Sequence, residues 1–229
     1  MLFGARAVYG AAWDFAKVDG FNLDTNTWDK AGTWPDVPAG GYGAAQIRAT
    51  GEIITVGLKK WSPVDKKFTE IASNLSGDPV RWPISFDACR NQVFSLQWGD
   101  GQGYEPQRLV AYRMPVGSNQ QVAVSINPSA ALTQWLADKP SYAGMDYDAD
   151  NDRFLFYSGM DASAGRVYVI KPNDGNTWDM SILAPAAGSV KIAQTGTGGL
   201  QNRLRYIPAL RGFVLLARGS SNLYFLRTA

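Results

Sequence analysis

A plan of two short apolar stretches separated by a polar turn recurs along the chain. Residues 84–96 contain an apolar stretch, a polar turn and a second apolar stretch, and residues 145–157 and 204–216 repeat that order. A shorter version covers residues 45–56. Short apolar runs of this kind, bounded by turn residues, are typical of β-hairpins. The pattern therefore predicts one hairpin in each of four successive units.

A second pattern consists of a polar turn that ends in an aromatic residue. Residues 21–28 and 61–68 align without a gap, and residues 169–178 align with one extra residue. Asx and Gly residues suit such turns because they tolerate left-handed backbone angles. The aromatic ring can fill the space between neighbouring sheets. We therefore expect a third and a fourth strand around each turn, with Trp28 and Trp178 packed in the core.

The repeats recur at roughly 40 to 55 residues, which is the period of a four-stranded propeller blade. At 229 residues the chain suits one all-β domain over residues 1–229. Its 24 glycines and 12 prolines are consistent with many tight turns. The sequence thus predicts an all-β propeller of about five four-stranded blades. Their approximate bounds are 1–38, 39–78, 79–141, 142–195 and 196–229.

Both end blades are predicted to be incomplete, because the last unit stops after its third strand and the first lacks its innermost one. An open edge strand exposes unpaired backbone groups. Either the first residues pair with the last blade, or a further segment or a partner supplies a strand. One capped short helix is expected between blades over residues 129–138, directly after Asn127 and Pro128.

The strand-turn-strand units, with the turn at residues 150–153 and the segment NLDTNTW at residues 22–28, resemble the kelch repeat of galactose-oxidase-like propellers. The final stretch, residues 202–227, is similar to the closing blade of uncharacterised kelch-like proteins of bacteria and their phages. The glycine pairs that end the second kelch strand are reduced to Ser158-Gly159 and Trp98-Gly99. The resemblance implies a kelch-type propeller, and it suggests a structural component of a phage virion or a cell surface.

The chain has no histidine. Its absence excludes Ser-His and Cys-His catalysis, histidine-ligated zinc and the histidine-containing copper site of galactose oxidases, so the resemblance concerns the scaffold only. The single cysteine, Cys89, is interpreted as incidental. The only glutamates are Glu52, Glu70 and Glu105, and no pattern pairs two carboxylates as a glycosidase requires. We therefore predict that the chain is not an enzyme and has no cofactor or metal.

Aspartates recur at every second residue over residues 146–152. This spacing suggests either a calcium loop or a structural turn, and the glycine and distal glutamate of an EF-hand are missing. The same positions correspond to the end of the first hairpin strand in other units, as at Asp87 and Ile207. The structural turn is therefore the preferred interpretation.

The 22 basic and 20 acidic residues leave a net charge of +2, which favours neither nucleic acid nor an anionic membrane as a partner. Residues 1–6 lack the pattern of a signal peptide, and no stretch approaches the ~20 apolar residues of a membrane helix. The sequence therefore predicts a soluble chain. Its location is left open, with a virion or an extracellular surface as the favoured places.

The longest loop that could bind a ligand covers residues 97–108. Its aromatic and polar side chains suit stacking on a sugar ring and hydrogen bonding to its hydroxyls. The alternative is a loop that packs on itself. Weaker candidates are residues 13–15, Trp34 and Trp82. The candidate binding residues of the loop are Trp98, Asp100, Gln102, Tyr104, Glu105 and Arg108.

Two classes of function remain after these exclusions. The first is a non-enzymatic structural or protein-interaction module in an assembly, which the incomplete end blades favour. The second is a lectin-like or glycosidase-related propeller that binds carbohydrate through the loop at residues 97–108. The sequence favours the first class, with a protein partner and with glycan as the alternative ligand.

Overall fold

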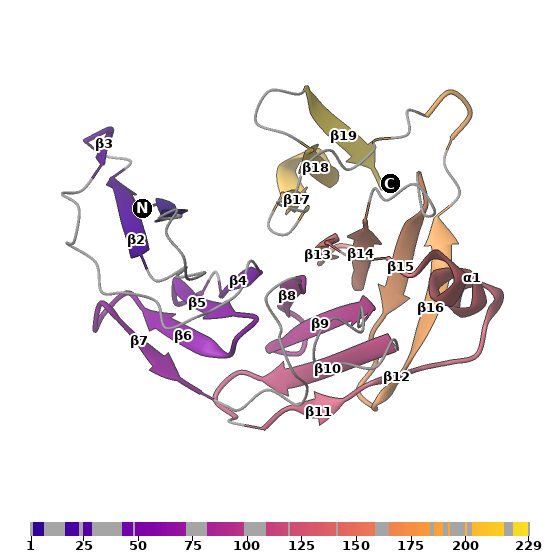
Figure 1. The fold of residues 1–229 in the computed structure, drawn as a ribbon, viewed down its shortest axis with the longest axis horizontal. Coiled ribbons are helices and arrows are strands. Elements are labelled where there is room, and N and C mark those ends of the chain that lie inside the picture. Colours follow the sequence, from indigo (N-terminus) through magenta and orange to yellow (C-terminus); the bar gives the residue numbers. More distant parts are fainter. Residues whose placement is uncertain are drawn as a thin grey trace, which may run out of the picture.

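The protein is an all-β structure in a computed structural model (Figure 1). The residues that it describes are 2–6, 17–22, 25–28, 43–47, 49–71, 82–98, 109–118, 120–140, 142–158, 165–183, 186–189, 192, 200, 203–217 and 222–228. In chain order the elements are β1 (Leu2–Arg6), β2 (Lys17–Asn22), β3 (Thr27–Trp28), β4 (Ala44–Ile47), β5 (Glu52–Thr55), β6 (Lys59–Ser62), β7 (Lys67–Glu70), β8 (Ile84–Asp87), β9 (Gln92–Trp98), β10 (Leu109–Pro115), β11 (Val122–Ala123), β12 (Ser125–Ile126), α1 (Ala130–Asp138), β13 (Gly144–Asp148), β14 (Arg153–Tyr157), β15 (Val167–Lys171), β16 (Thr177–Leu183), β17 (Leu204–Ile207), η3 (Pro208–Leu210), β18 (Gly212–Leu216) and β19 (Leu223–Arg227).

The described strands form five small sheets that follow one another along the chain (Figure 1). The sheet orders are β1-β2-β3, β4-β5-β6-β7, β11-β10-β9-β8, β12-β16-β15-β14-β13 and β17-β18-β19. Neighbouring strands are antiparallel except β12, which pairs in parallel with β16. Small antiparallel sheets arranged around a centre are the architecture of a β-propeller. The predicted fold class is therefore confirmed.

The first strands of four sheets meet at the centre of the molecule, where β4 lies next to β8, β8 next to β13, and β13 next to β17. The guanidinium of Arg205 on β17 donates to the backbone oxygen of Ala44 on β4 at 3.5 Å, which connects the last of these strands to the first. The sheet β1-β2-β3 lies farther from this centre (Figure 1). Four blades therefore surround the centre, whereas the sequence predicted about five.

Equivalent turns join the first two strands of these four blades. The residue before the second strand has a positive φ in each, with 72° at Gly51, 49° at Asn91, 50° at Asp152 and 48° at Arg211. Glycine, asparagine and aspartate adopt this left-handed conformation at the lowest cost, and arginine is the exception here. The repeated hairpin that the sequence predicted is thus present in all four blades.

The second predicted turn is present as well, but the burial predicted for one of its two tryptophans is wrong. Asn26 and Lys66 hold equivalent left-handed positions, with φ of 54° and 52°, as the gapless alignment of the two segments requires. Trp178 is completely buried, as predicted. Trp28 is 62% exposed, so its predicted core position is wrong. The strand that carries Trp28, β3, is only two residues long and gives the ring little sheet to pack on.

Within the described residues, the two ends of the chain do not share a blade. The last sheet has three described strands, with β19 at its edge. The first strand, β1, pairs with β2 from Leu2↔Phe21 to Arg6↔Lys17. The expectation that the first residues could pair with the last blade is therefore wrong. The local hairpin β1-β2 requires a shorter loop than pairing with the far end of the chain would.

The predicted helix is confirmed as α1, which begins after the N-cap residue Ser129. The Ser129 hydroxyl accepts the N–H of Leu132 at 3.0 Å, and the helix buries Trp135 completely. The segment before α1 carries β12 onto the outer edge of the fourth sheet in sequence. Within the part of the chain that the structure describes, no helix has the length and apolar character needed to cross a membrane.

Candidate functional site

The loop predicted to bind a ligand is described only at its start. The backbone of Trp98 ends β9 and pairs with Leu109. Of the weaker candidates, Trp82 is only 2% exposed and belongs to a core cluster, which argues against a binding role for its ring. The other candidates lie outside the described residues, namely Asp100, Gln102, Tyr104, Glu105, Arg108, Trp13, Asp14, Phe15 and Trp34.

The two buried aspartates that end a first strand hold hairpin turns. Asp87 accepts the N–H groups of Cys89 and Arg90, both at 3.0 Å. Asp148 accepts the N–H of Asn151 at 3.3 Å and the guanidinium of Arg153 at 2.9 Å. These contacts occupy the carboxylates with donors from their own turns, which supports the structural interpretation of the aspartate series.

The other aspartates of the series connect neighbouring blades. Asp146 accepts the Ser85 hydroxyl at 2.9 Å and the Tyr206 N–H at 2.8 Å. One carboxylate on β13 thus joins β8 and β17 at the centre. Asp150 accepts the Tyr206 hydroxyl at 2.5 Å. The aspartates therefore contribute to the way the blades are held together.

Asp152 forms a bidentate ion pair across two blades with Arg90, at 2.6 and 2.7 Å. The Arg90 hydrogen bonds lower the pKa of Asp152 to about 2, with a further contribution from the Tyr147 hydroxyl. Asp87, Cys89 and Asp152 lie close enough to share a metal ion. Arg90 contacts the carboxylates of Asp87 and Asp152, and its positive charge disfavours a cation between them. This cluster is therefore interpreted as structural.

The outermost strand of the last blade, β19, carries an unusual side-chain pattern for an edge. Four consecutive apolar residues, Leu223 to Leu226, precede Arg227. Leu223 is 65% exposed and Phe225 is 51% exposed. On the opposite face, Tyr224 and Leu226 pack against the core cluster between the last two blades. Exposed apolar edge strands are rare in proteins that stay free of partners.

The backbone N–H and C=O groups of successive residues on β19 point alternately toward β18 and toward the outer edge. Leu216 N–H donates to Arg203, and Thr228 N–H donates to Arg211. With the observed register, these bonds place Tyr224 and Leu226 in the hydrogen-bonded pairs with β18. The N–H and C=O groups of Leu223, Phe225 and Arg227 consequently point away from β18. The edge of β19 therefore offers three residues for pairing with another strand.

The other described blades treat their outer edges differently. On β7, the charged residues Lys67 and Glu70 lie at the two ends of a four-residue strand. On β16, the edge is covered by β12, where Ile126 pairs with Trp178 and is buried. Charged ends and a covering strand are both known means of protecting a sheet edge. Within the described residues, β19 has a charged residue at one end only, Arg227, and no covering strand.

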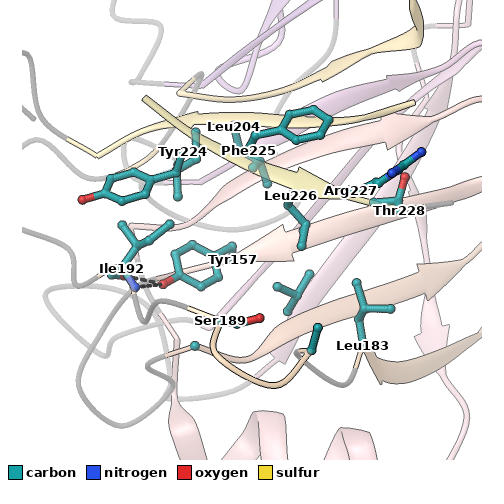
Figure 2. Close-up of a pocket in the computed structure, with 14 residues that line it drawn as sticks. Tyr157, Leu183, Ser189, Ile192, Leu204, Tyr224, Phe225, Leu226, Arg227 and Thr228 are labelled. Atoms are coloured by element: carbon teal, nitrogen blue, oxygen red, sulfur yellow. Dashed lines mark hydrogen bonds between the residues drawn. The ribbon is translucent and has the colours of Figure 1, made fainter. Parts of the chain in front are cut away.

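A cavity of about 520 Å³ lies beside the inner face of β19, between the last two blades (Figure 2). The Tyr157 hydroxyl bonds to the backbone of Ile192 at one side, and Tyr224 and Leu226 line the other (Figure 2). Arg227 is the only charged residue of the described lining. The complete described lining is Tyr157, Gly165, Val167, Leu183, Ala186, Ser189, Ile192, Leu204, Leu215, Tyr224, Phe225, Leu226, Arg227 and Thr228.

This region combines an apolar cavity with an open strand edge. The cavity is mainly apolar, and the adjacent strand offers backbone hydrogen-bonding groups together with exposed Leu223 and Phe225. Strand addition to an open edge uses this combination, because the backbone provides affinity and alternate side chains provide specificity. The candidate functional site is therefore the outer edge of β19 and the cavity behind it. Sequence reasoning predicted the open edge but missed the cavity.

Comparison with known proteins supports the fold alone. No protein-family model matches the chain, and no curated protein matches it. A crystal structure of a protein from Lactobacillus plantarum is similar, with a TM-score of 0.57 and 15% sequence identity. The match covers 93% of this chain and 58% of that protein, so the chain spans less than two thirds of its length. The kelch-type family remains a prediction.

Proposed function

We propose that this chain is a non-enzymatic β-propeller that joins other proteins in an assembly, and that the outer edge of its last blade is the binding surface. The observation that carries this proposal is the exposure of β19, the third and last described strand of its blade. Its apolar side chains at Leu223 and Phe225 are more than half exposed. Covering them with a partner strand removes this apolar surface from water.

The buried carboxylates support a structural role for the rest of the molecule. Asp138 is bound by Arg166, with oxygen-nitrogen distances of 2.7 and 2.6 Å, and by the Tyr168 hydroxyl. Burial alone would raise the pKa of Asp138, but these donors and Gln134 lower it. Asp148 is held by Arg153 in a similar way. A general acid needs a carboxyl whose pKa is raised toward neutrality, and the donors around Asp138 have the opposite effect.

We further propose that this assembly is a phage virion or a cell surface. The resemblance of the closing blade to kelch-like phage proteins supports this proposal. Carbohydrate binding is the alternative function. It depends on the loop at residues 97–108 and remains a prediction. The strand edge is a contact for proteins, since backbone hydrogen bonds along β19 match the spacing of another strand.

Photo-crosslinking tests the proposed function. A photoreactive phenylalanine analogue replaces Phe225 in the full chain, and a matched protein carries the analogue at Leu210, which is 55% exposed on the same blade. In cells that produce the protein, we expect protein adducts at position 225 and few at position 210. Folded protein that gives no adduct at position 225 would contradict the proposal.

A further inference from the structure

We propose that the strand that covers β19 is the β19 of a second copy of this chain, so that two last blades form one continuous sheet across a two-fold axis. This inference rests on the proposed function and names the partner at the same edge. It uses the polarity of the edge, the register of its open backbone groups and its side chains. Each of these features is compatible with a symmetric pair.

The polarity of the strands in a blade suits a second copy of β19. In the complete blades the fourth strand is antiparallel to the third, as β7 is to β6 and β16 is to β15. Two identical strands related by a two-fold axis perpendicular to the sheet are also antiparallel. A second copy of β19 therefore arrives with the polarity that the fourth strand of a blade has in this protein.

The register of the open backbone groups on β19 also suits a symmetric pair. The outward-pointing backbone groups belong to Leu223, Phe225 and Arg227, a set centred on Phe225. A two-fold axis at Phe225 places that residue opposite its own copy and places Leu223 opposite Arg227 of the second chain. Every outward N–H and C=O group of the three residues then has a partner. A shift of one residue would bring inward-pointing groups to the edge.

The side chains that this register places opposite each other are compatible. On the exposed face, the two Phe225 rings lie opposite each other, and aromatic cross-strand pairs stabilise antiparallel sheets. Each Arg227 faces Leu223 of the other copy, so the two positive charges stay apart. On the other face, Tyr224 lies opposite Leu226, and both already border the cavity between the blades. The strand is thus complementary to itself.

Disulfide trapping tests the register. Cys89 is exposed and is replaced by serine to remove its thiol. Residues opposite each other in a hydrogen-bonded antiparallel pair have Cα atoms roughly 5.5 Å apart, within the range of about 4.4 to 6.8 Å that a disulfide spans. We expect Phe225→Cys to form a disulfide-linked dimer under mild oxidation. Leu223→Cys should not, because its own copy lies roughly 13 Å farther along the strand.

A mixture of Leu223→Cys and Arg227→Cys proteins provides the matched control for the same register. Each protein alone should remain uncrosslinked, and the mixture should give a mixed dimer. Equal self-crosslinking of all three cysteine variants would contradict the two-fold pairing, because it would reflect random collisions.

Sedimentation equilibrium tests the dimer without crosslinking. The unmodified chain should show a concentration-dependent dimer, and Phe225→Lys should lose it because two like charges then face each other. Leu210→Lys, at another exposed apolar position of the blade, should keep it. Mixing Phe225→Lys with Phe225→Glu should restore dimers. A chain that is monomeric at every concentration would overturn the inference.

The same experiments separate this inference from the proposed function. A monomeric chain that still forms adducts with other proteins at position 225 would refute self-pairing and leave the interaction edge in place. A monomeric chain that forms no adduct there would refute both. Adducts between two copies would support both.

Discussion

The interactions of single residues are dominated by arginine-aspartate pairs that join turns and blades. Arg90 and Asp152 come from different blades and form two hydrogen bonds of 2.6 and 2.7 Å. The same arginine also contacts the buried Asp87. Because bidentate pairs fix both the distance and the orientation of their partners, this contact holds the second and third hairpin turns in one position.

The pair predicts a specific dependence of stability on pH. Arg90 lowers the pKa of Asp152 to about 2, below the value of ~3.9 in an unfolded chain. The stabilisation is therefore present above pH ~4 and is lost as the pH falls toward 2. Asp152→Asn should reduce the slope of stability against pH in this window, because asparagine keeps the left-handed backbone but cannot titrate. Urea unfolding at a series of pH values measures the slope.

Asp65→Asn is the matched control for this experiment, because Asp65 lies in the exposed turn between β6 and β7. It should leave the slope unchanged. The side chain of Asp152 is 36% exposed, so solvent weakens the effect. Identical slopes for Asp152→Asn and the unmodified chain would argue against the ion pair.

Gly212 in β18 gives a second test at the scale of one residue. A Cβ atom there would lie 2.6 Å from the backbone oxygen of Leu226 and 2.5 Å from the Phe225 ring. The backbone contact cannot be relieved by rotating a side chain, so Gly212→Ala should destabilise the last blade by about 1 to 3 kcal/mol. Gly117→Ala is not an equal control, since Gly117 has a φ of 85°.

Thermal unfolding of Gly212→Ala, compared with Val214→Ala on the same strand, measures this effect. Val214 is only half-buried, and its truncation should have the smaller cost. If Gly212→Ala is as stable as the unmodified chain, then β19 does not lie as close to β18 as the structure has it.

At the scale of elements, the helix α1 shows how far local sequence determines structure. The sequence predicted a capped helix after Asn127 and Pro128, and in the structure the Ser129 hydroxyl caps it by accepting the N–H of Leu132. Ser129→Ala should therefore cost about 1 kcal/mol, as is typical for an N-cap. Chemical denaturation measures the difference. Thr133→Ala, at an exposed position of the same helix, should cost less, and a larger loss for Thr133→Ala would contradict the assigned cap.

The hairpins could be predicted for a similar local reason. The polar turns at Asn91 and Asp152 need left-handed backbone angles, and the flanking apolar runs identify the strands. The exposure of Trp28 and the pairing of β1 with β2 could not be predicted in this way. Both depend on which distant sheet lies alongside, and a turn motif has no information about such a neighbour.

Part of the candidate site could likewise be predicted from the sequence, and part could not. The apolar run of β19 can be seen in the sequence. The cavity behind the strand could not be predicted, because its lining comes from Tyr157, Leu204 and Tyr224, which are far apart along the chain. Its shape depends on how two whole blades pack. Only the fold brings these residues together.

At the scale of the whole molecule, the centre is held by polar contacts between neighbouring first strands. Asp146 accepts hydrogen bonds from Ser85 and from the backbone of Tyr206, so one side chain connects three blades. Asp146→Ala leaves the buried Ser85 hydroxyl and a backbone N–H without this acceptor. Each such loss costs about 1 to 3 kcal/mol.

We therefore expect Asp146→Ala to lower the midpoint of urea unfolding far more than Asp65→Ala, which removes an exposed turn carboxylate. Equal midpoints for the two variants would indicate that the blades are held together without the central contacts. The expected loss is large because the polar groups at the centre are buried, whereas water can replace the contacts of a surface carboxylate.

Among the described residues, the exposed edge of β19 also differs from the outer edges of the other blades. Three other outer strands are short, charged or covered, and β19 presents Leu223 and Phe225 to its surroundings. The proposed interaction surface therefore requires that this edge is open in the isolated chain.

Residue-resolved amide hydrogen exchange on the dilute, monomeric chain tests this most directly. The N–H groups of Tyr224 and Leu226 point toward β18 and should exchange slowly, whereas those of Phe225 and Arg227 point outward and should exchange fast. Protection of Phe225 and Arg227 should appear only when a partner strand binds. Slow exchange of all four amides in the monomer would show that the chain already covers this edge, which would contradict the proposed interaction surface.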